Sequence, residues 1–151
     1  MIAESLLRRF SPLVWMSAVA MLGAAACSRP EPDRVSVQHI LVAFKGSVPD
    51  AKVTRSLAEA RELAFELYKR ARAGEDFDAL VKRYTDDEYP GTYSMSNFGI
   101  APDPARKEYP RAKMVKAFGD VSFRLKAGEI GLAEHDPKDS KYGWHIIKRL
   151  S

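Results

Sequence analysis

The sequence has little cysteine and little histidine: one cysteine, Cys27, and three histidines among 151 residues. A single cysteine cannot form an intramolecular disulfide, and both residue types are scarce for the usual four-ligand structural zinc site. No basic block is present either, because the 24 Lys and Arg residues are interspersed with 20 Asp and Glu residues. We therefore expect no metal site, no cofactor and no nucleic-acid partner.

Long hydrophobic runs are also missing, apart from one at the N-terminus. With 46% apolar and 29% charged residues, the composition is that of an ordinary globular protein. Low-complexity disorder, collagen and a multi-span membrane protein are thereby excluded. The length predicts one domain.

The N-terminal run has the order of a secretory signal, with basic residues followed by apolar and then small ones. Arg8 and Arg9 precede the apolar stretch 13–26, which ends in Gly-Ala-Ala-Ala directly before Cys27. This ending resembles the lipobox of bacterial lipoprotein signals, in which the cysteine thiol is acylated and becomes the new N-terminus. The resemblance implies a lipid anchor at Cys27.

A short membrane anchor or a buried helix with an incidental cysteine is the alternative for residues 13–26. The position of Cys27 at the apolar-to-polar boundary favours the lipoprotein. Ser28 resembles the residue that follows the cysteine in outer-membrane lipoproteins, which implies a bacterial cell-envelope protein facing the periplasm, held by the outer rather than the inner membrane. We expect a signal peptide over 1–26, a lipidated cysteine with a flexible tether over 27–34, and one domain over 35–151.

Hydrophobic periodicity predicts an α+β domain in which helices cover a sheet. Alternation over 35–44 places His39 on a strand, on the same face as Val37 and Leu41. Asp76 is the expected N-cap of a helix. The other predicted elements are helices over 54–73, 77–84 and 114–125 and strands over 93–98 and 142–150.

Two histidines and a cluster of hydroxyl and carboxylate groups are the candidates for chemistry. His39 and His145 lie on the first and last predicted strands, and a loop after the second helix contains Thr85, Asp86 and Asp87. An imidazole beside a carboxylate is a common acid/base grouping, because the carboxylate sets the tautomer and charge of the ring. The residues alone leave open a second interpretation, in which the histidines belong to the core and the aspartates form a solvated turn.

The order of the motifs favours the first interpretation. The segments are His39-Ile40-Leu41-Val42, Ala73-Gly74-Glu75-Asp76-Phe77, Tyr84-Thr85-Asp86-Asp87, Leu125-Lys126-Ala127-Gly128-Glu129-Ile130 and Gly143-Trp144-His145-Ile146-Ile147. In sequence and in order they resemble the parvulin family of peptidyl-prolyl isomerases. The resemblance extends from Val35 to the C-terminus, and several matched blocks make it specific where each alone would be weak.

The resemblance implies a four-stranded antiparallel sheet surrounded by helices, with a pocket for a peptide-proline unit on the sheet. Matched by position, four residues form a hydrogen-bonding network in its catalytic centre: His39, Thr85, Asp87 and His145. Rotation about an Xaa-Pro bond breaks no covalent bond, so we expect this network to shape the electrostatics of the site and none of its members to be a nucleophile.

Three further positions are implied to bind substrate, namely Tyr93, Met114 and Phe118. Met114 and Phe118 match the residues that clasp the proline ring, and Phe123 matches a neighbour in the core. Tyr93 stands where the family has an aliphatic pocket residue, which implies a narrowed or covered pocket.

Two stretches, 100–113 and 134–141, look inserted relative to the family. Lids, partner sites and solvated loops are the alternatives for both, and a solvated loop is favoured for His135. The early loop carries Lys45, Lys52 and Arg55 without a tight basic cluster, so a phosphate-directed specificity is not expected.

The first hypothesis for function is a lipid-anchored isomerase that acts on proline-containing polypeptide clients and assists their folding outside the cytoplasm. The alternative is a parvulin-like chaperone module that binds extended polypeptides with little or no isomerase activity. A third hypothesis, a hydrolase that uses His39 or His145 with Asp87, lacks a recognisable nucleophile pattern.

Overall fold

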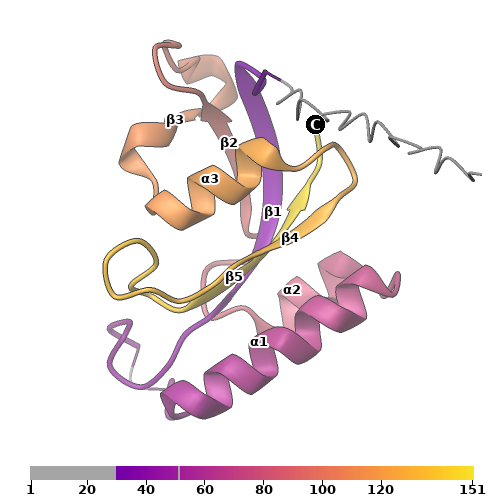
Figure 1. The fold of residues 1–151 in the computed structure, drawn as a ribbon, viewed down its shortest axis with the longest axis vertical. Helices are drawn as coiled ribbons and strands as arrows, with labels where there is room; N and C mark the ends of the chain where they lie inside the picture. The colour runs from indigo at the N-terminus through magenta and orange to yellow at the C-terminus, as the bar shows by residue number, and fades with distance from the viewer. Residues whose placement is uncertain (1–29, 51) are drawn as a thin grey trace, which may run out of the picture.

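Five strands in the described residues form one sheet, and three α-helices lie on its two faces (Figure 1). The computed structural model describes residues 30–50 and 52–151. The strands are β1 (Arg34–Val42), β2 (Thr92–Ser96), β3 (Tyr109–Pro110), β4 (Ile130–Ala133) and β5 (Trp144–Arg149). The helices are α1 (Leu57–Arg72), α2 (Phe77–Tyr84) and α3 (Lys116–Arg124), with short 3-10 helices η1 (Pro104–Arg106) and η2 (Arg111–Lys113).

The strand order is β3-β2-β1-β5-β4, which makes β1 the central strand. The pairs β1 with β2, β1 with β5 and β4 with β5 are all antiparallel. The predicted α+β class is therefore confirmed, but the sheet has a fifth strand, because β3 adds to β2 in parallel. Pro110 has no backbone N–H, so β3 ends after two residues at the edge of the sheet.

The alternation of side chains along β1 divides the core into two parts. Ile40 and Val42 face α1 and α2 and belong to one buried cluster, which includes Leu67 of α1. Val35 and Val37 face α3 and belong to a second cluster. Figure 1 shows α1 and α2 on one side of the sheet and α3 on the other. His39 shares the face of Val37, as predicted, so it projects toward the α3 side.

The helix boundaries follow local capping signals. The Ser56 side chain accepts from the backbone N–H of Glu59, and the Glu59 carboxylate accepts from the N–H of Ser56, which completes a capping box at the start of α1. The Asp76 side chain accepts from the N–H of Ala79 and caps α2. The predicted N-cap of α2 is confirmed, and α2 in turn places the loop of Asp86 and Asp87 beside β1.

Part of the segment predicted as a tether is joined to the domain. The Glu31 carboxylate accepts a hydrogen bond from Arg111 at 2.5 Å, and the Asn97 side chain donates to the carbonyl of Pro32 at 2.9 Å. β1 begins at Arg34 rather than Val35. Residues 31–34 therefore belong to the folded domain.

His135 in the 134–141 loop packs against aromatic rings of the domain. His135 is half-buried, and its ring lies 4.9 Å from the Phe44 ring and 5.3 Å from the Trp144 ring, centroid to centroid. Its Nδ1 atom is 2.9 Å from the carbonyl oxygen of Ser140. Aromatic partners from β5 and the loop after β1 therefore cover part of the ring, while most of the loop around it is exposed to solvent.

Candidate functional site

A cavity of about 360 Å³ opens on the α3 side of the sheet. Six of the residues predicted for the site line it, namely His39, Asp87, Tyr93, Met114, Phe118 and His145. The other lining residues are Leu41, Val48, Pro49, Asp50, Asp86, Val115 and Tyr142. Its size falls within the range of small-molecule and peptide pockets, and mostly apolar walls surround a few polar groups.

The two predicted histidines meet across neighbouring strands. In the β1–β5 pair, His39 is opposite Ile147 and Leu41 is opposite His145, so the imidazoles project from the same face at diagonal positions. Their Nδ1 atoms are 3.2 Å apart. His39 is 3% exposed and His145 is 4% exposed, so their mutual contact is largely shielded from water.

Asp87 ties this pair to the loop after α2. Its Oδ2 atom lies 3.0 Å from Nε2 of His39 and accepts a hydrogen bond from the Tyr93 hydroxyl at 2.8 Å. The contact with His39, followed by the one with Tyr93, holds the pKa of Asp87 well below its usual range. Burial and the bond to Asp87 raise the pKa of Tyr93 far above its ordinary value. An ionised Asp87 thus accepts from two donors.

These contacts join the two histidines and Asp87 in one hydrogen-bond chain. Burial, with a smaller contribution from His39, lowers the pKa of His145 to about 3, so its ring is neutral at pH 7. Since an ionised Asp87 only accepts, His39 donates to it from Nε2, and a second hydrogen bond joins the Nδ1 atoms of His39 and His145. The buried Nε2 of His145 then has no hydrogen-bond partner. Tyr93 and His39 thus both donate to the Asp87 carboxylate, and His145 is linked to it through His39.

Thr85 lies beside the site but does not line the cavity. Its hydroxyl oxygen accepts from the backbone N–H of Leu41 at 3.1 Å and from that of Asp87 at 3.2 Å. Thr85 is also the C-cap residue of α2. The side chain therefore fastens the loop of Asp87 to β1, and it positions the carboxylate rather than contacting either histidine.

Aromatic rings form the wall next to the histidines. The Phe118 ring centroid lies 5.1 Å from that of His39, 5.4 Å from that of His145 and 5.9 Å from that of Tyr93. Phe118 belongs to α3, and Met114 lies just before this helix. Phe123 is buried in the core on the same face and does not line the cavity. The arrangement offers an apolar surface directly against the hydrogen-bond chain.

The sequence did not indicate how the loops around the site are held in place. Asp86 accepts from the backbone N–H of Ala43 at 2.8 Å and pairs with Arg55, so its carboxylate holds the loop in place. Val48 and Tyr142 line the cavity from loops whose positions depend on long-range packing. Only the turn-forming composition around these loops was visible in the sequence.

Other predicted features fall outside this site. Cys27 and the predicted signal peptide precede the described residues. Within residues 30–50 and 52–151, no helix is long and apolar enough to cross a membrane. No group of three His, Cys, Asp or Glu side chains in the same residues is arranged to hold a metal ion.

Known proteins are similar to this chain in sequence and in fold. Foldase protein PrsA 4 of Bacillus cereus is 31% identical over 100 residues, which are 66% of this chain and 31% of that protein. Chaperone SurA of Pseudomonas fluorescens is 35% identical over 122 residues, which are 78% of this chain and 23% of that protein. The chain thus spans less than a third of the length of these relatives.

The fold matches the solution structure of TbPIN1 with a TM-score of 0.58 and 23% identity, over 80% of this chain and 99% of that chain. The family model described as the PPIC-type PPIASE domain matches residues 24–150. This match includes every described strand and helix and all of the cavity. The resemblance read from the sequence is therefore confirmed, and the chain belongs to the PpiC-type peptidyl-prolyl isomerase domain family, the parvulins.

Proposed function

We propose that this chain catalyses cis-trans rotation of Xaa-Pro bonds in polypeptide clients and thereby assists their folding. The observation that carries the proposal is the chain of Tyr93, Asp87, His39 and His145 at the floor of an apolar cavity. Relatives named as a foldase and a chaperone support clients that are polypeptides.

The apolar wall supplies the first part of the mechanism. Rotation of an Xaa-Pro bond has a barrier of about 18–20 kcal/mol, because amide resonance is lost in the twisted state. A proline ring packed against Phe118 and Met114 leaves water, and a less polar surrounding favours the twisted amide, which has the smaller dipole. Binding of the ring is thus coupled to a lower barrier.

The charge of Asp87 supplies the second part. A planar amide carries partial negative charge on its carbonyl oxygen, and this charge falls as resonance is lost. A prolyl carbonyl held beside the ionised Asp87 is therefore repelled more strongly when planar than when twisted. Tyr93 and His39 hold the carboxylate in place through their hydrogen bonds.

A hydrolase receives no support from the site. No Ser, Thr or Cys is among the described residues that line the cavity, and covalent catalysis by Asp87 would require access that two hydrogen bonds to the same oxygen restrict. A chaperone module without isomerase activity uses the same apolar wall, so the two remaining functions differ in the rate of rotation, not in binding.

The test is NMR exchange between the cis and trans forms of a short Ala-Pro peptide, with and without the purified protein. We expect catalytic amounts of protein to increase the exchange rate far above the uncatalysed rate, whose time constant is tens of seconds or longer. Chemical-shift changes that report binding, with no increase in exchange, would contradict catalysis and identify a polypeptide-binding module. Cleaved peptide would indicate hydrolysis.

We also propose that Cys27 is the site of a lipid anchor that holds the domain at the outer membrane of a bacterial envelope, facing the periplasm. The support is the order of basic, apolar and small residues before this single cysteine. We expect the membrane-extracted protein to begin at a lipid-modified Cys27 in its intact mass. A Cys27→Ser variant is expected to lack the modification, and an unmodified mature N-terminus in the wild type would contradict the anchor.

A further inference from the structure

A row of aromatic side chains leads from the cavity to the edge of the sheet. Val37 of β1 is opposite Tyr93 of β2, and Met95 of β2 is opposite Tyr109 of β3. Because paired residues share a face and alternate residues along a strand do so too, His39, Tyr93 and Tyr109 project from the same side. The Tyr93 ring lies 5.3 Å from the His39 ring and 5.9 Å from the Tyr109 ring.

The outer end of this row is open to solvent. Tyr109 is 50% exposed, whereas Tyr93 is half-buried and its hydroxyl donates a hydrogen bond to Asp87. Tyr109 comes from the stretch 100–113, which looks inserted relative to the family. This stretch therefore places an exposed aromatic ring directly next to a ring that lines the cavity.

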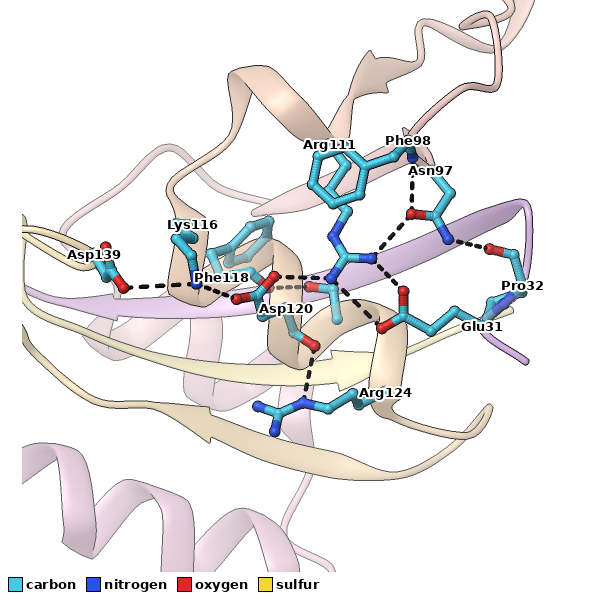
Figure 2. Close-up of polar contacts among 11 residues, drawn as sticks. Glu31, Pro32, Asn97, Phe98, Arg111, Lys116, Phe118, Asp120, Arg124 and Asp139 are labelled. Carbon is cyan, nitrogen blue, oxygen red and sulfur yellow. Dashed lines mark hydrogen bonds and ion pairs between the residues drawn. The ribbon is translucent and has the colours of Figure 1, made fainter. Parts of the chain in front are cut away.

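A buried cation fixes the backbone next to Tyr109. The Arg111 guanidinium donates to Asn97 at 2.9 Å and to Asp120 at 2.8 Å, as well as to Glu31 (Figure 2). It also stacks between two rings, with its central carbon 4.7 Å from the centroids of Phe98 and Phe123. Ion pairs and contacts with two aromatic rings leave this side chain little freedom.

The residue before Tyr109 is held as well. The Glu108 carboxylate accepts from Arg34 at 3.2 Å and from the backbone N–H of Asp103 at 2.8 Å. Arg34 also donates to the carbonyl of Ala101 at 2.9 Å. The contacts of Glu108 and Arg111 hold the backbone on either side of Tyr109. The Tyr109 ring is therefore preorganised next to Tyr93 before a client binds.

We propose that Tyr109, together with Tyr93, forms a subsite for an aromatic or large apolar side chain of the client polypeptide. The inference rests on the proposed function, in which the proline ring contacts Phe118. The rings of Phe118, Tyr93 and Tyr109 follow one another in two steps of 5.9 Å. An extended polypeptide advances about 3.3 Å per residue, so the preferred side chain lies two or three residues from the proline.

The subsite gives the domain a preference for segments that are buried in folded proteins. Aromatic and large apolar residues near a proline are exposed in an unfolded client and covered in its native state. Two adjacent tyrosine rings offer stacking and edge contacts to such a side chain and carry no charge that would exclude it. The domain would therefore release a client segment once that segment is folded.

The test compares proline peptides that differ at one position. Phenylalanine or alanine is placed two or three residues before or after an Ala-Pro unit, and affinity is measured by NMR titration of the purified protein. We expect wild type to bind at least one phenylalanine peptide about fivefold more tightly than its alanine counterpart. Tyr109→Ala should abolish that difference while leaving the alanine peptide unaffected, and Tyr109→Phe should retain it.

Leu57→Ala is the matched control, because Leu57 of α1 is an apolar residue of similar exposure, 48%, that neither lines the cavity nor belongs to the stretch 100–113. It should leave the preference for phenylalanine intact. Equal affinities of wild type for all peptides, or an equal loss for both peptide types in Tyr109→Ala, would overturn the subsite. The exchange rate of the alanine peptide, recorded in the same samples, tests isomerase activity separately: a retained phenylalanine preference without accelerated exchange supports the subsite and refutes only catalysis.

Discussion

Replacing Asp87 with alanine is expected to lower the catalysed exchange rate of an Ala-Pro peptide by about 100-fold, the usual order for removal of one preorganised electrostatic group. The carboxylate is the common acceptor of Tyr93 and His39, and its pKa is held well below the usual range, so it is charged throughout the neutral range. Removing it takes away both the charge that acts on the prolyl carbonyl and the group that orients His39. Line-shape or exchange NMR with the same peptide measures the loss.

An asparagine at this position separates the two contributions. Asp87→Asn keeps a side-chain oxygen for Tyr93 and His39 but removes the charge, so we expect nearly the same loss as with alanine if electrostatics dominate. Asp136→Asn removes the same unit of charge from the exposed loop between β4 and β5 and should retain the wild-type rate. Wild-type exchange in Asp87→Asn would show that the carboxylate only positions its neighbours.

The sequence was sufficient to predict the central contact of the site. Period-two alternation predicted that His39 lies on a strand, and the family resemblance implied that His145 is its partner; the structure places the two Nδ1 atoms 3.2 Å apart. Both strands are long enough, and apolar enough, for local pattern to determine their faces. Asp87 was identified through the family resemblance, because the residues alone left open a solvated turn after a helix with a clear cap.

Interactions set by distant residues were not predictable in this way. Tyr93 was interpreted only as a bulky replacement of an aliphatic residue. The hydrogen bond from its hydroxyl to Asp87 was not expected, because it depends on how two loops and β2 meet. Arg111 looked like one charge among many in an irregular stretch, and its burial requires Glu31, which is 80 residues away in sequence. Such contacts exist only after the sheet has formed.

Strand β4 was not predicted from the sequence pattern either. It has four residues, and Gly131 in its middle lowers its strand propensity. The glycine is required by packing, since a Cβ atom there would lie 2.7 Å from a methyl group of Val121 on α3. Periodicity cannot detect so short a strand, whereas the family resemblance implied it through the expected strand count.

A second large effect is expected from Gly143→Ala, which should destabilise the fold by about 3 kcal/mol or more. Gly143 has φ of +139°, a region that alanine rarely adopts, and a Cβ atom there would lie 2.1 Å from the carbonyl oxygen of Val42. Val42 pairs with Trp144 at the start of β5, so neither backbone can move without disturbing the β1–β5 ladder. Urea unfolding followed by circular dichroism measures the loss.

Gly128→Ala isolates the contribution of the steric clash. Gly128 also has a positive φ, +84°, but beyond its two chain neighbours no heavy atom lies within 4 Å of an added Cβ, so only the conformational cost of about 1–2 kcal/mol is expected. The clash at Gly143 lies two residues before His145, and a shift of β5 that relieved it would also separate the Nδ1 atoms of the histidine pair. Any Gly143→Ala protein that remains folded should therefore lose exchange activity beyond the loss explained by its unfolded fraction, whereas Gly128→Ala should not. Equal stability of the two variants would show that the approach of Gly143 to β1 does not constrain the site.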